Sequence, residues 1–217
     1  MKLLIMINNP PKIFRKILLG LFIIVITISF ISCNKNKTLI NRENMNEALI
    51  VIDVQEGFFS DPNYPVYNEN KLISNINLLI DSFRKKGRPI IFVRHIDEDL
   101  VKGTVPWEVF SKVHSKPGDI YVDKTTPDSF YKTDLLSVLK ANNIDSIVIV
   151  GLQTEYCIDT TCKSAFGKNI PVILVSDGHS TYDNSFMKAD RIIEYYNKII
   201  GRWFAKLKTT EEIINNH

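Results

Sequence analysis

Residues 146–162 have the sequence SIVIVGLQTEYCIDTTC, in which a β-branched apolar run is followed by a glycine and then by a helical pattern. A run without polar alternation is typical of a strand covered on both faces, as in a parallel sheet. The order of strand, tight turn and helix places Cys157 in the first helical turn. Backbone N–H groups and the helix dipole favour a thiolate there, so we predict a lowered pKa for this thiol.

Three further apolar runs of the same kind lie elsewhere in the chain: ALIVIDV (48–54), RPIIFVRH (88–95) and PVILVSD (171–177). Apolar residues at helical spacing lie between and after these runs: Leu72, Ile76, Leu79, Ile80 and Phe83; Leu135, Leu136 and Leu139; the segment after Tyr156; and Ile192, Ile193, Tyr196 and Ile199 within 186–203. The alternation predicts one three-layer α/β/α domain over residues 47–217, with a doubly wound, mainly parallel sheet. Ligands of such folds bind beyond the carboxyl ends of the strands.

The net charge excludes a nucleic-acid partner. The 217 residues carry a formal charge of +3, but residues 1–32 contain four basic residues and no acid. The remainder has 23 basic and 24 acidic residues. It therefore carries no net positive charge that could bind a phosphate backbone.

The N-terminal segment predicts export. Residues 17–32 (ILLGLFIIVITISFIS) are uncharged and apolar, follow a basic stretch and are short for a membrane-spanning helix. With Cys33 next, they resemble a bacterial lipoprotein signal, although Phe30 stands where an aliphatic residue is usual. The resemblance implies a signal peptide over 1–32, a lipidated Cys33, a polar tether over 33–46, and anchoring on the periplasmic or cell-surface side. The alternative is an uncleaved anchor with an incidental cysteine.

Two strand ends and one loop carry chemically notable side chains. Asp53 closes the first apolar run, Cys157 follows the third, and Lys124 lies in the segment 121–131. A carboxylate at the end of an apolar strand is unfavourable unless it is paired or used. Each residue also has an ordinary interpretation: a helix cap or ion pair for Asp53, a buried structural thiol for Cys157, and a solvated side chain for Lys124.

Taken in this order, the three residues resemble the catalytic triad of the isochorismatase-like cysteine hydrolases, which include the nicotinamidases. The matching segments are 48–55, 124–130 and 151–161, and the resemblance continues to about His179. The Gly-x-x-Thr-x-x-Cys element over 151–157 is the most specific part. Within the superfamily, residues 152–157 and 176–181 look closest to a branch of streptothricin hydrolase-like amidases.

The resemblance implies hydrolysis of a C–N amide bond. Cys157 would attack the carbonyl and form a thioester, Asp53 would take the thiol proton and pass it to the leaving amine, and Lys124 would supply a positive charge. A cis peptide between Leu152 and Gln153 would aim the N–H groups of Gln153 and Cys157 at the oxyanion.

The sequence departs from the nicotinamidase pattern at the metal site. That site uses Asp-x-His after the second strand, whereas this chain has Arg94-His95-Ile96-Asp97, and His114 has no assigned place. We therefore expect no metal and no cofactor, with His95 as a pocket wall or capped strand end. A Ser–His–Asp site using Asp177 and His179 lacks a Gly-x-Ser-x-Gly elbow.

The remaining predictions concern the pocket and the second thiol. Cys162 lies five residues after Cys157, about 140° around a helix, so neither a disulfide nor a zinc site is expected. Tentative substrate contacts are Gln55, Phe58, Trp107 (as a lid residue), Tyr131 and Tyr156.

Two other functions stay open: an isochorismatase-type vinyl-ether hydrolase, which can lack the cysteine, and a catalytically inactive, surface-tethered binding protein. The intact set of three residues favours the amide hydrolase. The predicted partners are a small amide-like molecule and a membrane, with a homo-oligomer as a further option.

Overall fold

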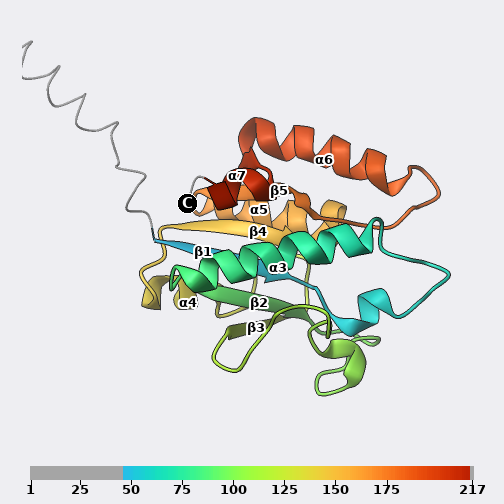
Figure 1. Ribbon diagram of the computed structural model, residues 1–217, viewed down its shortest axis with the longest axis horizontal. Coiled ribbons are helices and arrows are strands. Elements are labelled where there is room, and N and C mark those ends of the chain that lie inside the picture. Colours follow the sequence, from blue (N-terminus) through green and yellow to red (C-terminus); the bar gives the residue numbers. More distant parts are fainter. Residues whose placement is uncertain (1–45, 216–217) are drawn as a thin grey trace, which may run out of the picture. The chain divides into compact units, whose positions relative to one another are not determined.

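The computed structural model describes residues 46–215, which form a single parallel sheet with helices on both faces (Figure 1). The sheet order is β3-β2-β1-β4-β5-β6. All five pairings between neighbouring strands are parallel. The strands are β1 (Glu47–Ile52), β2 (Ile90–His95), β3 (Ile120–Lys124), β4 (Ser146–Gly151), β5 (Val172–His179) and β6 (Lys206–Lys208). The predicted α/β architecture is confirmed.

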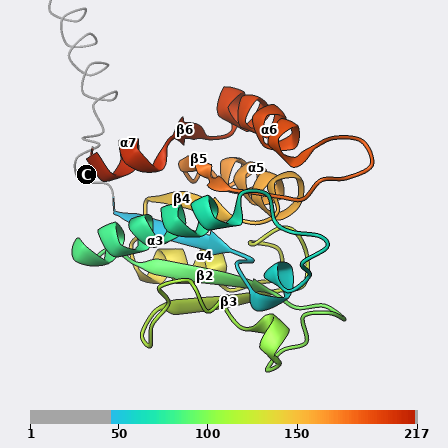
Figure 2. The ribbon, with the colours of Figure 1, turned by 45° about the vertical axis from the view of Figure 1, so that its right-hand side comes forward.

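Alternation along β1 divides the core into two layers. Leu49 and Val51 pack on one face, against α3 (Glu69–Lys85) and α7 (Thr210–Asn215). Ala48, Ile50 and Ile52 point to the opposite face. That face is covered by α4 (Leu135–Ala141), α5 (Asp159–Gly167) and α6 (Ala189–Trp203), and Figure 2 shows the layers from a second direction. Both faces of the sheet are therefore buried, which explains the continuous apolar runs.

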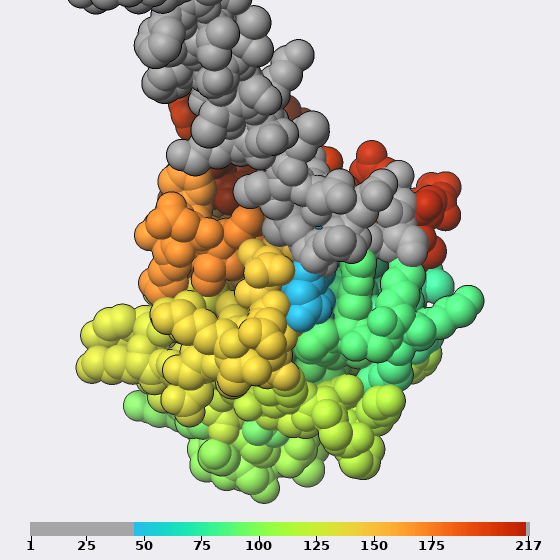
Figure 3. Space-filling view, turned by 90° about the vertical axis from the view of Figure 1, so that its left-hand side faces the viewer, coloured from blue at the N-terminus to red at the C-terminus, as the bar shows by residue number. Residues whose placement is uncertain are grey.

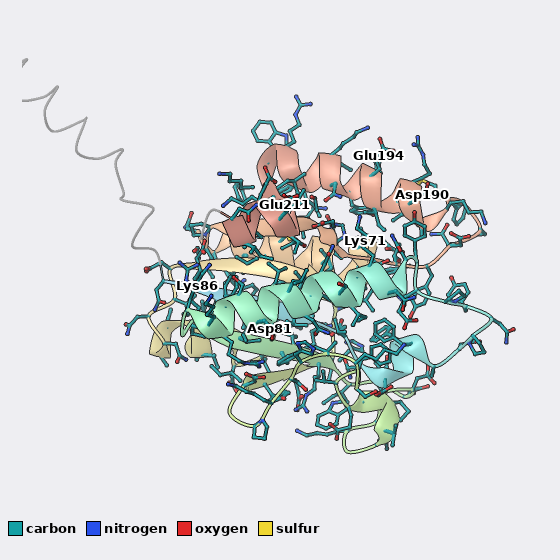
Figure 4. All side chains as sticks on the ribbon, viewed as in Figure 1. Lys71, Asp81, Lys86, Asp190, Glu194 and Glu211 are labelled. Atoms are coloured by element: carbon teal, nitrogen blue, oxygen red, sulfur yellow. The ribbon has the colours of Figure 1, made fainter. Side chains whose placement is uncertain are left out.

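The covering helices are amphipathic. In α3, Leu72, Ile76 and Leu79 are buried at spacings of three and four residues. The charged side chains labelled on α3 and α6 in Figure 4, such as Asp81 and Glu194, point away from the sheet into solvent.

Two strands and one helix carry no strong sequence signal. β3 has only five residues, lies at the sheet edge and ends in Asp123-Lys124, so it lacks an apolar run. β6 is the three-residue segment Lys-Leu-Lys at the other edge, and α7 has six residues. Short edge elements gain their conformation from the neighbour they pair with rather than from local pattern.

The amino ends of the strands lie at the edge shown in Figure 3, where the start of β1 lies between the ends of α3 and α4. The predicted signal segment and Cys33 lie outside the described residues. Within residues 46–215, no helix is long and apolar enough to cross a membrane.

At the opposite edge, β1 and β4 approach each other closely beside Gly151. This glycine has a φ of +121°, and a Cβ atom added to it would lie 2.0 Å from the carbonyl oxygen of Ile52. The residue that follows β1, Asp53, has a φ of +53°. Only a residue without a side chain fits at position 151. Glycine there lets β1 and β4 approach closely at the end of the sheet that carries the site described below.

Candidate active site

The carboxyl ends of β1, β3 and β4 bring together the three residues singled out in the sequence. The Lys124 ammonium donates to Asp53 Oδ2 at 2.7 Å and to Cys157 Sγ at 3.2 Å. The side chains of Asp53 and Lys124 are fully buried, and Cys157 is 8% exposed. Asp53 and Lys124 are 71 residues apart and Lys124 and Cys157 are 33 apart, so only the sheet order makes them neighbours.

Lys124 has a third acceptor that the sequence did not indicate. Its ammonium lies 3.1 Å from Nδ1 of His95, the last residue of β2. On the other side of the ring, His95 Nε2 lies 3.4 Å from Asp97 Oδ2. Burial and the charge on Lys124 lower the pKa of His95, opposed by Asp53 and Asp97. The only signal in the sequence was the position of His95 at the end of an apolar run, because the strand that carries Lys124 has no such run.

The Asp53 carboxylate accepts a hydrogen bond from the described residues through only one of its two oxygens. Its Oδ2 binds Lys124, whereas its buried Oδ1 has no hydrogen-bond partner among the described residues. The Asp53 carboxylate acts on the Cys157 thiol and has an open lone pair, so it can accept the proton of that thiol.

The predicted lowering of the Cys157 pKa is wrong for the resting site. Burial raises the pKa of this thiol to about 12, the negative charge of Asp53 adds to the rise, and Lys124 opposes it. The predicted helix-terminus effect is outweighed because the thiol is desolvated and faces a carboxylate. Cys157 therefore rests as a neutral thiol and needs a base in order to react.

The turn that carries Cys157 is η4 (Thr154–Ile158), a π-helical turn that leads into α5. It closes on the Gln153 carbonyl, which accepts the N–H groups of Tyr156 at 3.2 Å and Ile158 at 3.1 Å. The peptide bond between Leu152 and Gln153 is cis.

Gln55, expected as a substrate contact, is bonded to backbone groups in the described structure. It is fully buried, and its amide nitrogen donates to the carbonyls of His95 at 3.0 Å and Trp107 at 2.9 Å. Its amide oxygen accepts the His95 N–H at 2.6 Å. The side chain therefore ties the ends of β1 and β2 to the short helix η3 (Val105–Trp107).

Trp107, expected as a lid residue, packs against the Arg94 side chain. It is 7% exposed, and the Arg94 guanidinium covers its ring at 3.7 Å from the centroid. Arg94 and His95 are neighbours on β2, so their side chains point to opposite faces of the sheet. His95 faces Lys124, which puts the Trp107 ring on the other face.

The other three tentative contacts differ in accessibility. Phe58 is half-buried against the core, and its carbonyl accepts the Tyr182 hydroxyl at 2.6 Å. Tyr131 and Tyr156 are 52% and 56% exposed. These two rings are free to contact a ligand approaching from solvent.

The alternative chemistries lack support among residues 46–215. His179 is buried with both ring nitrogens engaged, to Thr154 Oγ1 at 2.9 Å and Asn197 Oδ1 at 3.0 Å. His114 pairs with Asp81 at 3.1 Å on the surface. No group of three His, Cys, Asp or Glu residues in this part of the chain is placed to hold a metal ion. Cys162 is a free, buried thiol.

Known proteins resemble this chain in sequence and in fold. The isochorismatase domain profile matches residues 47–201. The isochorismatase family protein YddQ of Bacillus subtilis is 27% identical over 179 residues, covering 78% of this chain and 99% of YddQ. Streptothricin hydrolase of Streptomyces noursei is 29% identical over 143 residues, covering 63% of this chain and 50% of that enzyme. A crystal structure of an isochorismatase family protein superimposes with a TM-score of 0.73 at 32% identity, covering 76% of this chain and 98% of the other.

Proposed function

The chain belongs to the isochorismatase family of hydrolases, and from that premise we propose that it cleaves the C–N amide bond of a small molecule through a thioester on Cys157. The observation that carries the proposal is the buried Lys124 ammonium, which binds the Asp53 carboxylate and the Cys157 thiol at the same time.

The reaction begins with proton transfer. Asp53 takes the thiol proton as Cys157 attacks the amide carbonyl, so the thiolate exists only while a new C–S bond forms. Lys124 lies 3.2 Å from the sulfur and stabilises its developing negative charge. Because burial and Asp53 raise the pKa of the thiol, Cys157 depends on Asp53 to take its proton when the sulfur attacks an electrophile.

In the steps that follow, Asp53 first donates the proton that it took from the thiol and then acts as a base again. Protonated Asp53 delivers its proton to the leaving nitrogen, the C–N bond breaks, and a thioester remains on Cys157. Asp53 then removes a proton from a water molecule, which attacks the thioester carbonyl; the C–S bond breaks, the carboxylic acid leaves, and Asp53 returns the proton to the Cys157 sulfur. The backbone N–H groups of Gln153 and Cys157 are the candidates for binding the oxyanion in both halves.

The test is a panel of small amides assayed for release of ammonia or amine, with isochorismate in the same panel. Asp53→Asn keeps the shape but removes the base, so turnover should fall by ~10²–10⁴, the usual contribution of general acid–base catalysis. A mass increase on Cys157 equal to the acyl group, seen by peptide mapping after rapid quenching, would support the thioester. Activity of Asp53→Asn within a few-fold of the parent would contradict the mechanism, and turnover of isochorismate alone would favour the vinyl-ether alternative.

We also propose that the enzyme is a membrane-anchored lipoprotein. The support is the apolar run 17–32 followed by Ser32-Cys33. Cys33→Ala should release the protein from the membrane fraction or leave an unprocessed precursor. Mature protein that stays membrane-bound with an unmodified Cys33 would overturn the lipid anchor and leave the hydrolase proposal unaffected.

A further inference from the structure

The Lys124 ammonium has three N–H donors and, in this site, three acceptors. Asp53 Oδ2, Cys157 Sγ and His95 Nδ1 lie at 2.7, 3.2 and 3.1 Å from Nζ. An ammonium can only donate, so His95 Nδ1 must accept and carries no proton. The ring is therefore neutral, with its proton on Nε2 facing Asp97.

We propose that His95 is a positioning residue, which holds the Lys124 ammonium between Asp53 and Cys157 and does so only as the neutral imidazole protonated on Nε2. This deepens the proposed function, on which it rests, by adding a residue outside the triad and a dependence on pH. Lys124 is 2% exposed, so water cannot readily replace the acceptor if His95 is removed.

The backbone of His95 is fixed by Gln55, which explains why a buried glutamine lies two residues after Asp53. One amide side chain accepts the His95 N–H and donates to its carbonyl, at 2.6 and 3.0 Å. The main chain from which the imidazole projects is therefore held in place where β1 and β2 end. This clamp gives the ring little freedom to withdraw from Lys124.

The charges around His95 set the direction of the pH effect. It faces the Lys124 ammonium from β3, the Asp53 carboxylate from the end of β1 and Asp97 from its own loop. Burial and Lys124 lower the pKa of His95, so the neutral form prevails until the pH falls below that pKa. Protonation then places a second cation against Lys124 and removes the N–H···N bond, so the site loses its geometry on the acid side.

Two variants separate the acceptor from the ring. In His95→Asn the side-chain oxygen can take the place of Nδ1 and accept from Lys124 without titrating. His95→Leu fills a similar volume without an acceptor. His114→Asn is the matched control, because His114 is an exposed histidine paired with Asp81. The first readout is the rate of Cys157 alkylation by iodoacetamide against pH, measured by peptide mapping, which needs no substrate.

His95→Leu should slow alkylation of Cys157 and lower kcat by roughly 10- to 100-fold, as for one lost hydrogen bond to a charged group, with a much smaller change in KM. His95→Asn should recover most of the alkylation rate and most of kcat. It should also lose less activity than the parent when the pH is lowered. Unchanged alkylation and turnover in His95→Leu would overturn the proposal. The proposal would also be overturned if His95→Asn behaved like His95→Leu. The imidazole would then matter for packing and not as a hydrogen-bond acceptor.

The outcome for His95 can be separated from the outcome for the reaction. If the parent cleaves no amide while the alkylation series follows expectation, the positioning role stands and the proposed reaction falls. If an amide is cleaved and His95→Leu alkylates and turns over like the parent, the reaction stands and the positioning role falls. Should His95→Leu fail to fold, His95→Asn and the parent still decide the pH dependence.

Discussion

Replacing Lys124 by methionine removes the ammonium and keeps a side chain of similar length. The Asp53 carboxylate, 2.7 Å from Nζ and fully buried, then has no counter-ion. Removing one partner of a buried ion pair typically costs about 3–5 kcal/mol because the other charge stays desolvated. Domain stabilities are of order 5–15 kcal/mol, so Lys124→Met should remove about a fifth or more of the free energy of unfolding.

Urea unfolding of the full chain, followed by tryptophan fluorescence, measures this loss. A double variant identifies its cause: adding Asp53→Asn to Lys124→Met removes the orphaned charge and should bring stability back to within about 1–2 kcal/mol of the parent. Lys198→Met is the control, since its bond to Glu194 is also 2.7 Å long but joins side chains 74% and 45% exposed. It should cost about 0.5 kcal/mol or less.

A loss of less than about 1 kcal/mol in Lys124→Met, a value typical of an exposed pair, would contradict the role of the buried charge. A double variant as unstable as Lys124→Met alone would also contradict it, because the loss would then come from packing rather than from charge.

Three further outcomes are expected. Gly151→Ala should lower the free energy of unfolding in urea by about 3 kcal/mol or more, since its Cβ would lie 2.0 Å from the Ile52 carbonyl oxygen at a φ of +121°; parent-like stability would contradict this. Burial lowers the pKa of His179 from 6.5 to about 4, so the unfolded chain binds its proton first as the pH falls. Between pH 6.5 and 4 the parent should therefore lose about 3 kcal/mol more stability than His179→Gln, and parallel pH profiles would refute it. Limiting iodoacetamide should modify Cys157 before Cys162, because Cys162 is 0% exposed and burial also raises its pKa; equal labelling with activity retained would argue against a nucleophilic Cys157.

The main part of the sheet could be predicted from sequence because its inner strands are buried on both faces. Such strands are continuous apolar runs, and four of them mark β1, β2, β4 and β5. β3 could not be found in this way, since its five residues pair at an edge and include the exposed Tyr121. The neighbourhood of Lys124 therefore depended on resemblance rather than on pattern.

The chemistry of the site was less predictable than its residues. Asp53 and Cys157 follow strands with strong signals, and their convergence is expected from parallel topology. The raised pKa of Cys157 depends on burial and on the facing carboxylate, which no local sequence pattern records. The same holds for His95 and Gln55, whose contacts join residues 29 and 40 positions apart.

The sheet order also limits which side chain can stand at position 124. β2 lies between β3 and β1, and neighbouring strands are about 4.8 Å apart, so the side chains of residue 124 and Asp53 must together bridge roughly 10 Å between their main chains. A histidine is too short for that crossing, and the broad, planar guanidinium of arginine would need room for five donors where only three acceptors converge. The width of one intervening strand thus sets the distance that the side chain at position 124 must span. Among the natural cationic side chains, only lysine has the length and the head group that match this distance.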